Sequence, residues 1–256
     1  MSKTSNALNT PGAKLIGYFP AGYPTLDESV EAAVAMCDAG VDVLEFGVPY
    51  SDPVMDGLVI QHATEEALAN GFKLKNLFDA VREITSRVNS PVLVMTYWNP
   101  VMQFGIAEFA RELAAAGAAG MITPDLIPDE AAEWLRISDE LGLDRVFLST
   151  PTSSDDRASV TANLSRGFVY AVSTMGITGA REDLDKLARG VVAKIRTADP
   201  EQKVAVGIGI STNDQVKEVN GYADGAIVGS VFITSYREGG IEALKSKVRE
   251  LVAGLN

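Results

Sequence analysis

The sequence predicts an α/β protein: a single (β/α)8 TIM barrel of parallel strands with extra helices, spanning residues 1–256 as one domain. Short β-rich runs alternate with helical segments along the whole chain, and no second strand-rich block or low-complexity linker marks a boundary. Eight such runs can be counted, and 256 residues is typical of one such barrel. The alternative is an open doubly wound sheet, which favours a GxGxxG turn after the first strand, but the chain has FPAGYPT there.

The expected strands are short runs rich in β-branched and aromatic residues. In chain order they are 14–19, 41–47, 91–97, 119–123, 145–149, 167–173, 203–208 and 223–229. Helical windows with apolar residues at three- and four-residue spacing separate them, and several end in a glycine where a C-cap is expected. Residues 57–89 are long enough for two helices, so one lies outside the eightfold repeat. Residues 241–255 are expected to form an amphipathic closing helix.

Composition excludes several classes of protein. The net charge of −12 and the lack of a Lys/Arg-rich run argue against a nucleic-acid surface. No apolar stretch approaches the roughly 20 residues needed to cross a bilayer. The first residues, MSKTSNALNTPGAK, lack the apolar centre of a secretory signal. We therefore expect a cytoplasmic protein that contacts neither nucleic acid nor membrane.

Cysteine and histidine each occur once, as Cys37 and His62. Cys37 lies on an apolar helical face, which favours a core thiol, and a single cysteine excludes an internal disulfide. A single histidine excludes a Ser-His-Asp triad and a multi-histidine metal site, and His62 is expected at the surface or near a helix cap. We therefore expect no metal site and assign acid–base chemistry to carboxylates or tyrosines.

Residues 43–61, VLEFGVPYSDPVMDGLVIQ, carry the main functional signal. Glu45 lies within an apolar strand, and a buried carboxylate is costly unless it is paired or protonated. An ion pair inside the barrel is one interpretation; a carboxyl at the carboxyl end of the strand, with a raised pKa, is the functional one. In the loop that follows, Asp56 is the better catalytic candidate, and Asp52, before a proline, is expected to brace the loop by hydrogen bonds.

Glycine-rich turns follow the last three expected strands, at STMGITG (173–179), VGIGIS (206–211) and VGSVF (228–232). Glycine lets backbone N–H groups approach an anion closely, and a following helix N-terminus adds donors. Barrels of this class place phosphate at the loops after strands seven and eight. The turns therefore predict a phosphomonoester ligand. Tyr97 and Tyr170 lie in strands, where a core role and a pocket role are about equally plausible.

The motifs resemble one known family. LEFGVPYSDPVMDGLVIQ followed by MGITG, GIGIS and VGS is similar to the α subunit of tryptophan synthase, and YFPAGYPT, LVMTYWNPV and MITPDLIPDEA continue the match in order along the chain. The resemblance implies a lyase of tryptophan biosynthesis that splits indole-3-glycerol phosphate into indole and glyceraldehyde 3-phosphate. It also implies a β subunit partner in an α2β2 heterotetramer, with pyridoxal phosphate held by β, no cofactor in this chain, and indole passing to β through a tunnel.

The resemblance also implies residue roles. Glu45 and Asp56 would be the catalytic carboxylates and Tyr170 the pocket tyrosine, while Asp125 would communicate with the β subunit. The remaining implied contacts are Gly179, Gly209, Gly229 and Ser230 for phosphate, and Met95, Tyr97 and Leu148 for indole. One departure is Thr174, which stands where many members have arginine and puts that side chain's contact in doubt.

Three alternatives remain open from the sequence. An aldolase or isomerase of another sugar phosphate would keep the barrel, but a Schiff-base aldolase needs a lysine near a strand's carboxyl end, and Lys14 and Lys203 lie at the other face. A non-catalytic phosphate-binding regulatory subunit would keep the partner and lose the reaction. A self-sufficient lyase would release indole without a β subunit.

Overall fold

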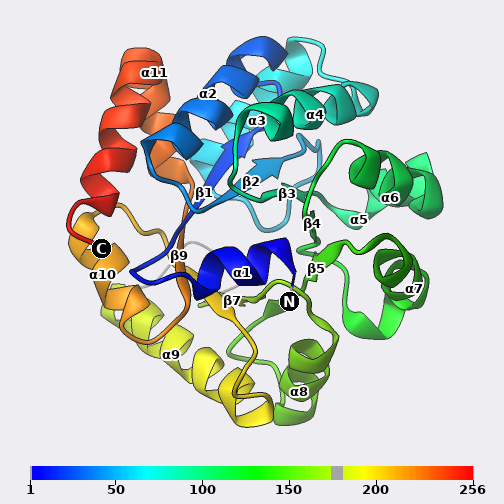
Figure 1. Ribbon diagram of the computed structural model, residues 1–256, viewed down its shortest axis with the longest axis vertical. Coiled ribbons are helices and arrows are strands. Elements are labelled where there is room, and N and C mark those ends of the chain that lie inside the picture. Colours follow the sequence, from blue (N-terminus) through cyan, green and yellow to red (C-terminus); the bar gives the residue numbers. More distant parts are fainter. Residues whose placement is uncertain (1, 174–180, 256) are drawn as a thin grey trace.

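The structure is a computed structural model that describes residues 2–173 and 181–255; helices surround a ring of strands (Figure 1). The strands are β1 (Leu15–Pro20), β2 (Val43–Gly47), β3 (Val92–Met95), β4 (Gly120–Ile122), β5 (Asp144–Val146), β6 (Leu148–Ser149), β7 (Val169–Val172), β8 (Val204–Gly207) and β9 (Gly225–Val228). The α-helices are α1 (Lys3–Asn9), α2 (Leu26–Ala39), α3 (Leu58–Ala69), α4 (Leu77–Arg87), α5 (Trp98–Phe104), α6 (Ile106–Ala115), α7 (Ala132–Leu141), α8 (Asp155–Leu164), α9 (Arg181–Ala198), α10 (Asn213–Asn220) and α11 (Ser230–Val252). Two short 3-10 helices are η1 (Leu74–Asn76) and η2 (Pro128–Glu130).

The described strands pair in the order β5-β4-β3-β2-β1-β9-β8-β7-β6, all in parallel. Only Phe147 separates β5 from β6, so the two ends of this sheet belong to one extended segment. That segment pairs with β4 through β5 and with β7 through β6, and the Phe147 carbonyl accepts from the Tyr170 N–H at 3.0 Å. The barrel is therefore confirmed. The expected fifth strand, 145–149, is divided because its two halves pair with different neighbours.

One layer of apolar side chains fills the inside of the barrel. It takes residues from most strands: Ile16, Val43, Leu93, Val146, Phe168, Ala205 and Ile227. Because side chains alternate between the faces of a strand, the residue two positions later on each strand also points inward. That second layer, nearer the carboxyl ends, contains Tyr18, Glu45, Met95, Leu148, Tyr170, Gly207 and Gly229. The change from apolar to polar and glycine residues marks where the core ends and a site begins.

Helix α1 covers the amino end of the barrel and was not expected from the sequence. It crosses the middle of the ring in Figure 1 and packs Leu8 against the inner apolar layer. Its Thr4 N–H donates to the Asp144 carboxylate at the start of β5 at 3.4 Å, and its Ser5 hydroxyl donates to the Gly167 carbonyl at 3.1 Å. With this end covered, access to the interior lies at the carboxyl ends of the strands.

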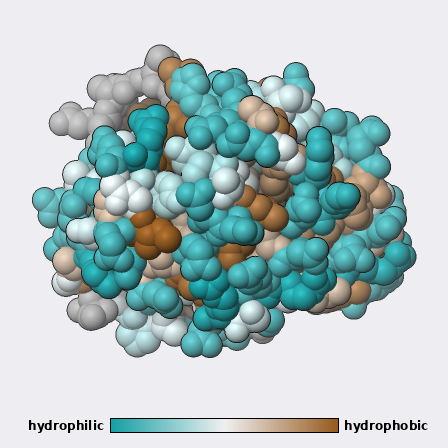
Figure 2. Space-filling view, turned by 90° about the horizontal axis from the view of Figure 1, so that it is seen from above, coloured by the Kyte–Doolittle hydropathy of each residue, from teal (hydrophilic) through white to brown (hydrophobic). Residues whose placement is uncertain are grey.

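The outer helices follow the sequence pattern closely. Two helices, α3 and α4, occupy the segment where one extra helix was expected. The closing helix was also expected from residue 241, and α11 has non-helical backbone at Gly239 and Gly240, so a helical part does begin there. Figure 2 shows a mostly hydrophilic surface with hydrophobic side chains in small groups, as the acidic composition suggests. Among the described helices, none has the length and apolar character needed to span a membrane.

Candidate active site

Glu45 is the buried polar residue of β2. Its side chain points into the barrel, the residue is 1% exposed, and its Oε1 atom has no hydrogen-bond partner in the described structure. Burial raises the pKa of Glu45 to about 8, because the charged form is poorly solvated there. The described residues offer Glu45 no cation within ion-pair distance, so the interior ion pair considered as an alternative is not found there. A carboxyl with this pKa is mostly protonated at neutral pH.

Asp56 lies in the loop after β2, and Tyr97 holds this loop in place. The Tyr97 hydroxyl accepts from the backbone N–H groups of Val54 and Met55 at 3.2 and 3.0 Å and donates to the Asp56 carboxylate at 3.3 Å. Burial raises the pKa of Asp56 to about 6, and the hydrogen bond from Tyr97 opposes that rise. Tyr50 stacks on Tyr97 with ring centroids 5.1 Å apart. Asp56 is therefore mostly ionised at neutral pH, unlike Glu45.

The remaining predictions from this part of the sequence concern Asp52, His62 and Cys37. Asp52 accepts a hydrogen bond from the adjacent, exposed Ser51 hydroxyl at 2.6 Å, and its role in bracing the loop stays a prediction. His62 is exposed and lies 3.6 Å from Glu65 on the same helix. Cys37 is largely buried, and burial raises the pKa of its thiol to about 12, as fits a core thiol.

Tyr170 on β7 points into the barrel beside Leu148, its register partner on β6. Its hydroxyl lies over Gly207 of β8, where an added Cβ atom would lie 2.5 Å from the Tyr170 oxygen. Burial, and then the nearby charges of Glu45 and Asp56, raise the pKa of Tyr170, so its phenol stays protonated. Met95 ends β3 as the register partner of Gly47. Thus Tyr170, Leu148 and Met95 all lie in the inner layer that contains Glu45.

Two of the predicted phosphate turns differ in the donors they leave free. At the first, Gly209 has φ +71° and open space where a Cβ would be, but the helix that follows, α10, caps itself. The Gln215 side chain accepts from the N–H groups of Ser211 and Thr212 at 2.8 and 3.2 Å. At the second turn no side chain of residues 2–173 or 181–255 caps the start of α11 at Gly229 and Ser230. The uncapped N-terminus of α11 therefore offers the freer backbone donors.

Two sequence predictions fall on residues that the structure does not describe. Gly179 and Thr174 both lie in the stretch 174–180.

Asp125 follows β4 and accepts a hydrogen bond from the Trp98 N–H at 2.8 Å, which ties its loop to the start of α5. This contact stabilises two loops at the carboxyl end of the barrel, and the predicted role of Asp125 in communication with a partner stays a prediction.

Tyr18 on β1 is the site residue that the sequence reasoning missed. It is 4% exposed, faces inward, and is the register partner of Glu45. Burial, Asp56 and Glu45 raise its pKa, so its phenol is protonated near both carboxyls. The sequence KLIGYF could have revealed it. Side chains alternate between the two faces of a strand, so Tyr18 points inward like Ile16 and lies at the same level as Glu45.

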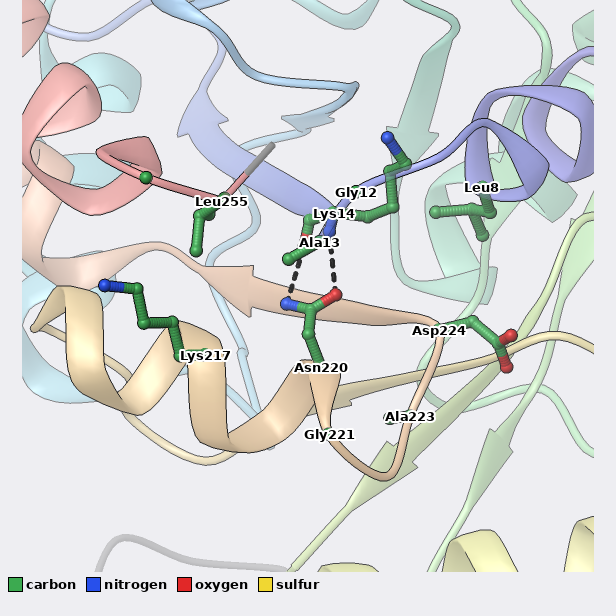
Figure 3. A pocket seen from close by; sticks show the side chains of 11 residues that line it. Leu8, Gly12, Ala13, Lys14, Lys217, Asn220, Gly221, Ala223, Asp224 and Leu255 are labelled. Atoms are coloured by element: carbon green, nitrogen blue, oxygen red, sulfur yellow. Dashed lines mark hydrogen bonds between the residues drawn. The ribbon is translucent and has the colours of Figure 1, made fainter.

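A cavity of about 450 Å³ lies at the opposite end of the barrel (Figure 3). It is bordered by Lys14 and Asp224, which precede β1 and β9. Asn220 bridges the two sides, because its amide accepts from the Lys14 N–H and donates to the Lys14 carbonyl, as the dashed lines show. Lys14 bonds to the Pro11 carbonyl, and Lys203 pairs with Asp224 at 3.1 Å. Neither lysine is therefore at the carboxyl ends, which argues against a Schiff-base aldolase.

Comparison with known proteins agrees with this geometry. The family model described as tryptophan synthase alpha chain matches residues 4–254. A tryptophan synthase alpha chain from Leifsonia xyli subsp. xyli is 61% identical over 240 residues, covering 94% of this chain and 92% of that protein. One from Mycobacterium avium is 49% identical over 243 residues, covering 95% and 89%.

Solved structures show the same similarity in three dimensions. A chain of tryptophan synthase from M. tuberculosis, in an aminoacrylate-bound form, superposes with a TM-score of 0.91 at 42% identity and covers 100% of both chains. A chain of a tryptophan synthase complex from Pyrococcus furiosus gives 0.84 at 34% identity, covering 94% of this chain and 98% of that one. Together with the carboxyls of the buried Glu45 and the half-buried Asp56 at the open end of the barrel, these matches establish that the chain belongs to the tryptophan synthase alpha chain family.

Proposed function

We propose that this chain cleaves indole-3-glycerol phosphate into indole and glyceraldehyde 3-phosphate by a retro-aldol reaction. The observation that carries the proposal is the pair of inward carboxyls, Glu45 and Asp56, whose pKa values are raised to about 8 and about 6. At neutral pH one is a proton donor and the other an anion. Two carboxyls whose environments separate their pKa values are the usual arrangement for paired acid and base roles.

The reaction needs two proton transfers at the bond that breaks. Glu45 delivers its proton to indole C3, which turns the ring into an electron-poor indoleninium. The bond between C3 and the hydroxyl-bearing carbon then breaks, and its electron pair returns to the ring. The hydroxyl loses its proton to the Glu45 carboxylate, which forms the aldehyde and restores the acid.

Asp56 acts on the indole ring. As a carboxylate near the ring N–H, it stabilises the positive charge that develops when C3 is protonated by drawing the N–H proton toward itself, and this proton returns to the ring nitrogen as the carbon–carbon bond breaks. The hydrogen bond from Tyr97 favours the anionic form of Asp56 and fixes its loop. Tyr97, Met95 and Leu148 form the walls of the indole pocket, and Tyr170 offers its hydroxyl beside Glu45.

The phosphate binds at the turns after the last barrel strands. Gly229 and Ser230 supply the uncapped N-terminus of α11, and Gly209 supplies an open backbone position with φ +71°. Gly179 is assigned to the same site. Anchoring the phosphate holds the glycerol chain in register with Glu45 and Asp56, so this part of the site contributes positioning.

The partner is a tryptophan synthase β subunit in an α2β2 assembly, with pyridoxal phosphate bound by β and no cofactor required in this chain. Exposed large apolar residues follow the carboxyl ends of β2, β3 and β4: Val54, Leu58, Met102 and Ile127. Such side chains around the open end fit a docked protein surface through which indole passes. Asp125 lies among these loops, and we assign it the role of communicating with the docked partner.

The decisive experiment measures indole release from indole-3-glycerol phosphate by the purified chain, alone and with a β subunit added. Slow release that rises strongly with β supports the partnered enzyme. Fast release alone indicates a self-sufficient lyase. No release in either condition from folded protein overturns the lyase and leaves the regulatory subunit. Glu45→Gln is the matched control, because it should bind phosphate ligands normally and release no indole.

A further inference from the structure

The Tyr18 side chain crosses the inner layer of the barrel from one strand neighbour to the other. Near its base, a Cβ atom added at Gly229 of β9 would lie 3.3 Å from the Tyr18 Cβ and Cδ1 atoms. At its tip, a Cβ added at Gly47 of β2 would be only 2.3 Å from the Tyr18 hydroxyl. Two glycines therefore make room for this side chain, and only a residue without a side chain at position 47 leaves space for the hydroxyl.

The Tyr18 hydroxyl is a hydrogen-bond donor without a partner among the described residues. The residue is 4% exposed, yet its hydroxyl makes no hydrogen bond to any group in the described parts of the chain. By contrast, the hydroxyl of Tyr97 is already hydrogen-bonded to the loop that carries Asp56. Because this hydroxyl has no partner among the described residues, it is available to donate a hydrogen bond to a ligand in the site. Its neighbour in register, Glu45, has an unpartnered oxygen as well.

Resting on the proposed function, we propose that Tyr18 is a further substrate-positioning residue whose hydroxyl hydrogen-bonds a hydroxyl of the glycerol chain. The ring runs from the phosphate turn at Gly229 to Gly47 on β2, the strand that carries Glu45. The glycerol chain must span the same two strands, since it joins the phosphate to indole C3. A donor at the Glu45 end of this span meets the hydroxyl-bearing carbons. The raised pKa of Tyr18 keeps the phenol protonated, so it donates.

The test compares Tyr18→Phe with Tyr23→Phe. Tyr23 is also buried, at 5% exposed, and lies just after β1 against Phe19 and Tyr236, outside the inner layer. Each variant loses one hydroxyl and keeps its ring. We expect Tyr18→Phe to lower kcat/KM about three- to tenfold, the range for one lost hydrogen bond between neutral groups, and Tyr23→Phe to leave it unchanged. Thermal melts confirm that both variants fold.

A second measurement separates positioning from pocket shape. The inhibition constant of 3-(indol-3-yl)propyl phosphate, which lacks both glycerol hydroxyls, should be equal in the wild type and Tyr18→Phe. Three results for Tyr18→Phe would each overturn the assignment. The first is a loss of affinity for this analogue as large as the loss in kcat/KM, and the second is an unchanged kcat/KM. The third is a shift of the alkaline limb of the pH profile, which would mean that the hydroxyl bonds to Glu45. An inactive wild type overturns the proposed function itself, whereas an active wild type with an equally active Tyr18→Phe overturns only the role of Tyr18.

Discussion

Replacing Glu45 by glutamine should make the protein more stable at alkaline pH while it abolishes cleavage. The folded-state pKa of Glu45 is about 8 against an ordinary value of 4.5. Because the folded pKa is the higher one, the folded state holds the proton more tightly. Wild-type stability is therefore fully present below about pH 4.5 and is lost as pH rises through about 8. Glutamine has nearly the same shape and does not ionise, so it avoids this loss.

The size of the effect follows from the pKa difference. At about 1.4 kcal/mol per unit, the rise from 4.5 to about 8 corresponds to roughly 5 kcal/mol, which is an upper value because partial solvation of the charged form reduces it. Asp56 also has a raised pKa, but it is present in both proteins and cancels in the comparison. We therefore expect the two proteins to differ little at about pH 5 and by several kcal/mol at about pH 9.

The assay is urea unfolding at about pH 5, 7 and 9, with the free energy of unfolding extrapolated to water. Glu112→Gln, an exposed position in the middle of α6, is the control and should track the wild type at every pH. If the wild-type and Glu45→Gln free energies stay parallel across this range, then Glu45 is ionised or solvated in the folded protein. That result would refute its assignment as the neutral acid at indole C3.

Two further predictions concern the rate. The pH profile of kcat/KM should rise with ionisation of Asp56 near pH 6 and fall with deprotonation of Glu45 near pH 8; a profile flat from pH 5 to about 9 would contradict the paired roles. Gly209→Ala should raise KM, since its Cβ enters the phosphate turn. Gly142→Ala is the matched control, because both glycines have positive φ, +71° and +68°, and open space for a Cβ. Both variants should lose similar stability. If the KM of Gly209→Ala equals that of Gly142→Ala, then Gly209 is not part of the phosphate site.

Much of this molecule was predictable from short-range patterns. The eight strands follow from runs of β-branched and aromatic residues, and the extra helix in 57–89 follows from segment length. Glu45 stood out because a carboxyl in an apolar strand requires a reason. The exposed histidine and the core cysteine also followed from their neighbours. In each case the residues that decide the outcome are close together in the sequence.

Helix α1 escaped prediction for the opposite reason. It is only 7 residues long, and short helices are marginal without tertiary contacts. Its partners are distant in sequence, since Thr4 meets Asp144 and Ser5 meets Gly167. The division of the fifth strand at Phe147 also depends on distant contacts, because β5 pairs with β4 and β6 pairs with β7.

The sequence by itself determined the fold class and the order of most of its elements, and it singled out Glu45 and Asp56 as candidate catalytic carboxyls, because strand–helix alternation and a carboxyl set within an apolar run are local features of the chain. Only the tertiary structure decided that Tyr97 holds the Asp56 loop, that α10 caps itself while α11 does not, and that Tyr18 stands beside Glu45. Each of these depends on the register between strands or on the path of a loop, which is set by packing over the whole barrel. The pKa values follow from the same packing, since burial is a property of the closed barrel and not of any one segment.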